Sequence, residues 1–168
     1  ETPTLSEEEQ LAVRKTVAEH NVGRLPILLG CGGNCTRKIV DRLSKDKMED
    51  VDAILSVVPY YNKPSQEGMY AHFKAISEAT DIPIILYNVP GRTGVNMLPE
   101  TTLRLATDCK NVVGIKEASG NMEQIEYILR NRPEGFKVFS GDDGITLPLI
   151  KKGADGVISV IGNAYAAE

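Results

Sequence analysis

The chain has 168 residues, of which 42% are hydrophobic and 25% charged, and its formal net charge is −4. This composition suits one ordinary domain with a sizeable core and argues against disorder. No basic stretch is interleaved with aromatic residues and no apolar run is long enough to span a bilayer, so neither nucleic acid nor a membrane is expected as a partner.

Six short apolar runs are predicted to form strands. They are almost continuous in apolar residues, which is typical of strands that are covered on both faces. They are LPILLG (25–30), AILSVV (53–58), IPIILY (82–87), VVGIK (112–116), FKVFS (136–140) and GVISV (156–160).

Helix signals precede and separate these runs. Ser6 and Glu9 read as a capping box for the first helix, and Ser65 precedes apolar residues at helical spacing. The other predicted starts are Asn34 or Thr36, Pro99, Asn121, and Asp142 or Asp143, with Gly153 closing the last helix.

One helix, five strand-helix units and a final strand predict a parallel sheet with right-handed crossovers. A doubly wound sheet would show a glycine-rich phosphate loop, but GCGGN (30–34) lacks the G-x-G-x-x-G spacing. A (β/α)8 TIM barrel uses roughly 30 residues per unit, which fits the recurrence of the strands. We therefore expect residues 1–168 to be one partial barrel domain with about six of eight strands, cut at both ends.

The residues just past the C-terminal ends of barrel strands meet on one face, which carries the active site. That face holds a lysine and several tyrosines, but no nucleophile–histidine–acid triad and no cluster of metal ligands. Its members are Gly32, Gly33, Asn34, Tyr60, Tyr61, Asn62, Tyr87, Asn88, Lys116, Glu117, Ser140, Gly141, Asp142 and Ser159.

Lys116 stands where a strand should still be buried. A desolvated lysine loses its proton more easily, and the neutral amine can add to a carbonyl and form a Schiff base. A nearby tyrosine could then relay protons. The alternative is that Lys116 pairs with Glu117 or Asp142 and only closes the strand. Likewise, the loop residue Arg92 could clamp a carboxylate or could simply be solvated.

Three cysteines, an odd number, suit a reducing cytoplasm better than a disulfide framework. Cys31 and Cys35 form a C-x3-C pair, but no second pair of cysteines or histidines follows at metal-binding spacing. We expect no metal site and a cytoplasmic protein.

Five stretches are distinctive as a set: PYYNKPSQEG (59–68), YNVPGRTG (87–94), GIKEASG (114–120), FSGDDG (139–144) and GVISVIGN (156–163). In this order and spacing they resemble the dihydrodipicolinate synthase family of pyruvate-dependent class I aldolases, also called 4-hydroxy-tetrahydrodipicolinate synthases. The resemblance implies a (β/α)8 lyase that condenses pyruvate with L-aspartate 4-semialdehyde to 4-hydroxy-tetrahydrodipicolinate, in lysine and diaminopimelate biosynthesis.

The resemblance also implies roles for individual residues. Lys116 matches the Schiff-base lysine and Tyr87 matches the tyrosine that relays protons, while no separate cofactor or metal is needed. Tyr61 matches a tyrosine inserted by a neighbouring subunit, which implies a homo-oligomer, usually a tetramer built as a dimer of dimers. Arg92 matches the arginine that holds the semialdehyde carboxylate. Gly141 and Ile158 match positions that line the pyruvate pocket.

A second group of residues bears on regulation. Lysine-inhibited members of the family hold lysine at positions that match Gly32, Asn34 and Tyr60, together with an acidic residue and histidines. Here Lys38 replaces the acidic residue, so we expect a degenerate effector cleft with weak or absent lysine feedback, because two cations repel. Inhibition of the full-length protein by submillimolar lysine would contradict this expectation.

Two rival functions remain open on the sequence. Another lyase of the same superfamily, such as an N-acetylneuraminate lyase or a keto-deoxy-sugar aldolase, would share Lys116 and Tyr87 but generally lacks an arginine matching Arg92. The second rival is a catalytically silent barrel fragment that acts as a binding module. The family's Gly-Thr-Thr-Gly-Glu segment would lie just before Thr2, and only Glu1 of it is present, so we expect the chain alone to be inactive.

Overall fold

The computed structural model describes residues 2–46 and 48–165, and these contain one six-stranded sheet. All neighbouring strands run parallel, in the order β1-β2-β3-β4-β5-β6. The strands are β1 (Leu28–Gly30), β2 (Ala53–Val57), β3 (Ile84–Asn88), β4 (Val112–Glu117), β5 (Lys137–Ser140) and β6 (Gly156–Val157). The prediction of a parallel sheet is confirmed.

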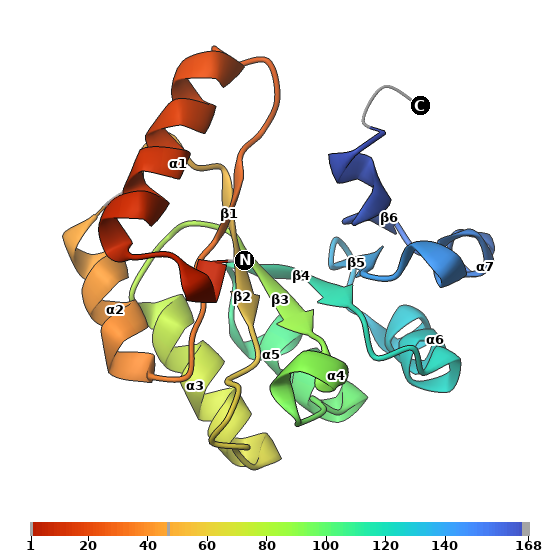
Figure 1. Ribbon diagram of the computed structural model, residues 1–168. Helices are drawn as coiled ribbons and strands as arrows, with labels where there is room; N and C mark the ends of the chain where they lie inside the picture. The colour runs from red at the N-terminus through yellow and green to blue at the C-terminus, as the bar shows by residue number, and fades with distance from the viewer. Residues whose placement is uncertain (1, 47, 166–168) are drawn as a thin grey trace.

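Helices alternate with these strands. They are α1 (Glu7–Asn21), α2 (Thr36–Lys45), α3 (Gln66–Glu78), α4 (Pro90–Thr93), α5 (Pro99–Asp108), α6 (Met122–Asn131) and α7 (Thr146–Lys151), with short 3₁₀ turns η1 (Thr2–Thr4), η2 (Asp143–Ile145) and η3 (Ile161–Asn163). Figure 1 shows the strands as a central arc, with α2, α3, α5, α6 and α7 around its outer side. The sheet is therefore part of a (β/α)8 barrel that is open between β1 and β6. A doubly wound sheet is excluded because its strand order reverses at a switch point, and this order is strictly sequential.

Most of the predicted helix starts are confirmed. Ser6 and Glu9 form the capping box reciprocally, and the side chains of Ser65 and Asn121 each accept a backbone N–H of their helix. Pro99 is the first residue of α5. α2 begins at Thr36, one of its two predicted starts, and the preceding Cys35 makes no side-chain cap bond.

The two outer strands are shorter than predicted, for reasons of backbone hydrogen bonding. The run 25–30 pairs only from Leu28, because Pro26 has no N–H to donate and the N–H of Ile27 goes to the Asp52 carboxylate. The run 156–160 leaves the sheet after Val157. Beyond it, Asp143 accepts the N–H groups of Val160 and Ile161 and so directs the chain into η3.

The hydrophobic core lies between the sheet and the helices. Leu86, Ile115 and Val138 occupy one register level of the sheet and are fully buried beneath the helix layer. Burying such a side chain contributes roughly 1.5–3 kcal/mol. The next level, which points to the inner face because side chains alternate along a strand, contains Tyr87 and Lys116.

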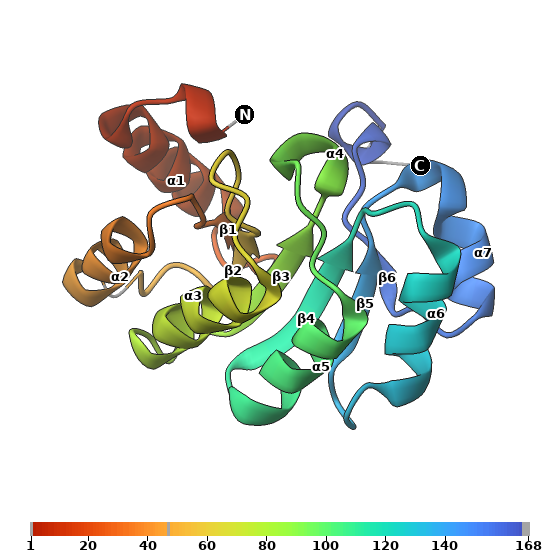
Figure 2. The same cartoon turned by 90° about the horizontal axis from the view of Figure 1, so that it is seen from below.

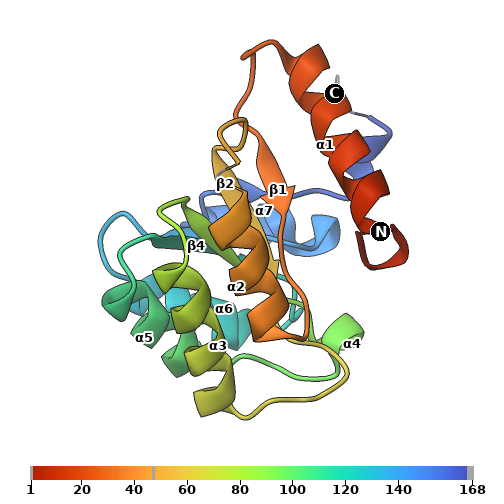
Figure 3. The ribbon, with the colours of Figure 1, turned by 90° about the vertical axis from the view of Figure 1, so that its left-hand side faces the viewer.

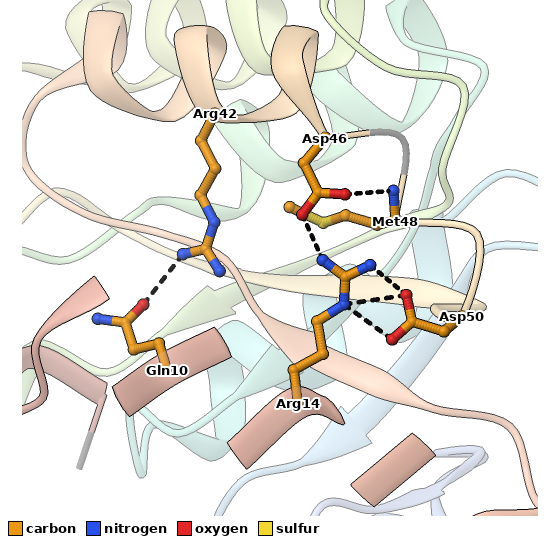
Figure 4. Close-up of polar contacts among 6 residues, drawn as sticks. All are labelled: Gln10, Arg14, Arg42, Asp46, Met48 and Asp50. Carbon is orange, nitrogen blue, oxygen red and sulfur yellow. Dashed lines mark hydrogen bonds and ion pairs between the residues drawn. The ribbon is translucent and has the colours of Figure 1, made fainter. Parts of the chain in front are cut away.

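Helix α1 is joined to the rest of the fold by charged contacts (Figure 4). Arg14, the one residue of α1 that is buried, donates Nε to both carboxylate oxygens of Asp50, at 3.0 and 2.9 Å, and its Nη1 pairs with Asp46. The apolar residues Leu11 and Val13 are 42% and 54% exposed. Figure 3 shows α1 set apart from the layer of α2 and α3, so its apolar residues find no cover among the described residues.

Candidate active site

Tyr87 and Lys116 lie side by side on the inner face of the sheet. They are register partners near the C-terminal ends of β3 and β4, and the Lys116 Nζ lies 4.4 Å from the centroid of the Tyr87 ring. In Figure 2 the arrows of β3 and β4 point toward α4, the short helix that carries Arg92. The edge predicted to hold the chemistry is thus assembled by two neighbouring parallel strands.

The Lys116 amine has no ion-pair partner within 4.0 Å among residues 2–46 and 48–165. The residue is only 8% exposed, and burial lowers the pKa of its ammonium, with a smaller opposing effect from the charge of Asp143. The predicted alternative of a pair with Glu117 or Asp142 is not found in the described structure. The amine is therefore placed to lose its proton more readily than an exposed lysine.

Tyr87 is half-buried, and its environment keeps the phenol protonated. Burial raises its pKa, while the positive charge of Arg92 opposes that rise. A neutral phenol beside an amine can both donate and accept a proton, as a relay requires.

Gly141 allows the end of β5 to approach the lysine. A Cβ at this position would lie 2.7 Å from the Ala118 Cβ and 3.0 Å from the Lys116 Cε, both too close for a side chain. The N–H of Ile158 donates to the Ser140 carbonyl at 2.9 Å, which places this half-buried residue beside the same strand end. The predicted pocket positions Gly141 and Ile158 are thus near neighbours of the sheet edge that holds Lys116.

Arg92 is exposed on α4, and its side chain makes no hydrogen bond or ion pair with the described residues. α4 itself was not predicted. It begins with Pro90 and is capped at its C-terminal end by Gly94, whose φ of 74° glycine adopts without strain. These two signals were present in the sequence and could have revealed the helix.

Among the described residues, no hydrogen bond or ring contact joins Tyr61 to Lys116 or Tyr87. Tyr61 is 89% exposed and has a φ of +74°, an uncommon conformation for a residue with a side chain. The neighbouring Asn62 donates Nδ2 to the carbonyl of Asn34 at 3.2 Å, so the two loops after β1 and β2 are in contact. The predicted role of Tyr61 across a subunit interface stays a prediction.

The predicted effector residues lie on the same two loops and on α2. A Cβ on Gly32 would come within 2.7 Å of the Val57 backbone nitrogen, so only glycine fits there. Lys38 is exposed on α2, and Tyr60 is partly buried. Their predicted role in lysine binding stays untested.

Asp143 and Glu117 are polar residues whose roles the sequence did not reveal. Asp143 accepts the Ser159 hydroxyl at 2.5 Å and two backbone N–H groups of the β6–η3 segment. The Ser159 hydrogen bond lowers the pKa of Asp143 most, and the backbone hydrogen bonds and the charge of Lys116 add to this effect. Glu117 is fully buried on the opposite face from Lys116. Both act through contacts between distant parts of the chain, which no local pattern encodes.

Neither a metal centre nor a membrane-spanning helix is found among residues 2–46 and 48–165. No group of three or more His, Cys, Asp or Glu residues could hold a metal ion in this part of the chain. Within the same residues, none of the helices has the length and apolar character needed to cross a membrane.

The chain matches the model of the dihydrodipicolinate synthetase family over residues 1–168. It belongs to that family. A relative named 4-hydroxy-tetrahydrodipicolinate synthase, from Phocaeicola vulgatus, is 62% identical over 168 residues, which are 100% of this chain and 57% of the relative. The chain thus spans a little over half the length of the curated relatives that it matches.

Solved structures of the family agree with the fold. Dihydrodipicolinate synthase from Aquifex aeolicus superposes with a TM-score of 0.93 at 44% identity, covering 98% of this chain and 56% of that one. The chloride-inhibited synthase from Acinetobacter baumannii, solved in complex with pyruvate, gives 0.92 at 45% identity, covering 97% and 56%. The six strands of this family member are therefore part of a TIM barrel.

Proposed function

We propose that the protein carrying this chain is a lyase of lysine and diaminopimelate biosynthesis that condenses pyruvate with L-aspartate 4-semialdehyde to 4-hydroxy-tetrahydrodipicolinate. The observation that carries the proposal is the buried, unpaired amine of Lys116 beside the Tyr87 phenol. The names of the relatives and the pyruvate complex of one of them support the choice of substrates.

The chemistry needs no metal and no separate cofactor. The neutral amine of Lys116 adds to the 2-oxo carbon of pyruvate, and loss of water gives an iminium. The iminium draws electrons from the adjacent methyl group, which loses a proton and becomes a nucleophilic enamine carbon. That carbon forms a bond to the aldehyde carbon of the semialdehyde, whose oxygen takes up a proton. The amino group of the semialdehyde then adds to the iminium carbon, which closes a six-membered ring, and the Lys116 amine leaves as its bond to that carbon breaks. Tyr87 is the group nearest Lys116 that can carry these protons.

Arg92 supplies recognition of the second substrate. Its guanidinium makes no hydrogen bond or ion pair with the described residues, and a guanidinium binds a carboxylate through two parallel hydrogen bonds. Gly141 leaves the lysine stem unobstructed, because a Cβ there would lie 3.0 Å from the Lys116 Cε, and in this proposal the pyruvyl group lies beside Gly141 and Ile158. This arrangement favours the synthase over a sugar lyase of the same superfamily, for which an arginine at this position has no carboxylate to bind.

The oligomer and the cellular location are parts of the same proposal. The exposed ring of Tyr61 fits a homo-oligomer in which it reaches a neighbouring subunit, as in a tetramer made from two dimers. The partners are the two small substrates and further copies of the chain, and the site of action is the cytoplasm.

Reductive trapping tests the proposal. The full-length protein is incubated with pyruvate and borohydride, and peptide mapping locates the reduced adduct, which we expect on Lys116. The trapped enzyme is then compared with free enzyme for turnover of the semialdehyde and of acylated sugar acids. A protein that gains no adduct refutes the Schiff-base chemistry, whereas an adduct with turnover of sugar acids alone supports the rival lyase. The 168-residue chain, tested in parallel, is expected to be inactive.

A further inference from the structure

A network of buried polar groups lies behind the candidate site, on the helix side of β3 and β4. Its centre is Glu117, a carboxylate that is 0% exposed and has no cation within ion-pair distance among the described residues. An unpaired carboxylate is costly to bury unless donors surround it. Such a group in the strand that carries Lys116 calls for a structural or functional reason.

The Glu117 carboxylate accepts all its hydrogen bonds from uncharged N–H groups. The backbone N–H of Ser119 donates to Oε1 at 2.8 Å, Gln124 Nε2 donates to Oε2 at 3.1 Å, and Asn88 Nδ2 lies 3.2 Å from both oxygens. Burial raises the pKa of Glu117, and these hydrogen bonds oppose that rise. The ring of donors therefore suits the ionised form.

Backbone groups of Met97, whose polarity cannot change, help to orient both amides toward Glu117. The N–H of Met97 donates to Asn88 Oδ1 at 3.0 Å, so the NH₂ of that amide must face Glu117. The carbonyl of Met97 accepts Gln124 Nε2 at 3.2 Å, which turns that NH₂ toward Glu117 as well. A carboxylate at position 117 is the acceptor that this geometry requires.

The same network pins both ends of the segment 88–97, which carries Arg92. Asn88 is the last residue of β3, and Met97 lies just before α5. Asn96 exchanges hydrogen bonds with the Gln124 amide at 2.8 and 3.2 Å. Glu117 thus holds the start of the segment directly, through Asn88, and its end through the two amides.

The segment needs this anchor because Arg92 itself has none. Its side chain is exposed and makes no hydrogen bond or ion pair with the described residues, so the position of the guanidinium depends on the backbone path of the segment. Tyr87 directly precedes the segment on the inner face. The relative placement of Lys116, Tyr87 and Arg92 is consequently set from behind the sheet.

We propose that Glu117 is a positioning residue for the reaction: its buried carboxylate locks the Asn88 and Gln124 amides and thereby sets where Arg92 meets the carboxylate of the second substrate. The inference rests on the proposed function, since it assumes that Lys116 binds the keto acid and Arg92 binds the aldehyde. Glu117 acts through other residues and touches no substrate.

Steady-state kinetics of Glu117→Gln in the full-length protein test the inference. This substitution keeps the side-chain shape but sets an NH₂ against the surrounding donors. We expect pyruvate to be trapped on Lys116 as in the wild type, with a KM for pyruvate within about threefold, while the KM for the semialdehyde rises about tenfold or more, because small misplacements of a clamping group are costly. In an Arg92→Ala background, Glu117→Gln should raise the KM for the semialdehyde by less than about twofold, since the two residues act as one unit.

The matched control is Asp155→Asn. Asp155 is another carboxylate that ties strands together, accepting the Val138 N–H at 2.9 Å and Lys137 Nζ at 3.0 Å, but it lies at the N-terminal ends of the strands. The Asp155→Asn substitution should leave the KM for pyruvate and the KM for the semialdehyde unchanged. If Glu117→Gln does not fold, Gln124→Met on α6 carries the test and should raise the KM for the semialdehyde alone.

An unchanged KM for the semialdehyde in Glu117→Gln or Gln124→Met would overturn the inference, as would an equal rise in the Arg92→Ala background. Failure of the proposed function would be seen separately, in a wild-type protein that pyruvate and borohydride leave unmodified.

Discussion

The polar residues on the two faces of β3 and β4 differ in whether they have hydrogen-bond partners. On the outer face, Asn88 and Glu117 are fully buried and make hydrogen bonds to each other and to the chain around them. On the inner face, the Tyr87 hydroxyl and the Lys116 amine have no hydrogen-bond partner among the described residues, although both side chains are at least half-buried.

This difference distinguishes polar groups that stabilise the fold from polar groups that are left free to bind a ligand. Polar groups that stabilise a fold satisfy one another, because an unmet buried group costs about 1–3 kcal/mol. Groups that act on a substrate must keep their hydrogen-bonding capacity free for it. Residues 116 and 117 are adjacent in sequence and fall on opposite sides of this division, because side chains alternate along a strand.

Removing the phenol from the inner face should have the largest effect on turnover. Tyr87→Phe keeps the ring beside Lys116 but deletes the hydroxyl that we propose carries protons, so kcat should fall about 10²- to 10⁴-fold. Adduct formation with pyruvate should slow, whereas the melting temperature should change little, since the hydroxyl has no partner among the described residues. Retention of near-wild-type turnover would contradict the relay.

Filling the space beside the lysine should have an intermediate effect. In Gly141→Ala the new Cβ would lie 3.0 Å from the Lys116 Cε, so the lysine stem must move and kcat/KM should fall about tenfold or more. Gly156→Ala is the matched control. Its Cβ would meet Phe139 at an ordinary 3.5 Å, and kcat/KM should stay within about twofold of the wild type. Equal losses in the two variants would show that the effect is not specific to Lys116.

A change in the structural carboxylate Asp155 should affect stability alone. Burial by itself would raise its pKa, but hydrogen bonds from the Val138 N–H and from Arg132 and Lys137 hold the pKa at about 2, against an ordinary 3.8. A depressed pKa stabilises the folded state above pH 3.8, and this contribution is lost as the pH falls toward 2.

We therefore expect Asp155→Asn to lower the free energy of unfolding at pH 7 by about 1 kcal/mol, because water screens a partly exposed pair. Denaturant unfolding of both proteins from about pH 7 down to about pH 2.5 measures the difference, which should shrink as the solution becomes acidic. A difference that grows toward low pH would contradict the assigned shift.

The sequence allowed much of the inner face to be predicted. Continuous apolar runs indicated where the strands lie, and parallel strands bring their C-terminal ends to one edge. The sequence alone therefore predicted that Lys116 and Tyr87 lie at the same edge of the sheet. Their identity as a pair also followed from the motifs GIKEASG and YNVPGRTG.

The outer face could not be predicted in the same way. From the sequence, an ion pair between Glu117 and Lys116 remained possible. The alternation of side chains along a strand nevertheless indicated that these two adjacent residues point to opposite faces of the sheet. The actual partners of Glu117, which are Asn88 and Gln124, depend on how separate elements pack, and this is not written in local spacing. The same holds for Arg14, a buried arginine on α1 whose partner Asp50 is 36 residues away.

The proposed chemistry depends above all on the Lys116 amine, which burial without an ion pair leaves easier to deprotonate than an ordinary lysine. The most direct test is the rate of borohydride trapping with saturating pyruvate in the full-length protein, measured as a function of pH and assigned to Lys116 by peptide mapping. We expect a titration midpoint below the ordinary lysine value of 10.5. A midpoint at or above that value would contradict the assigned role of burial.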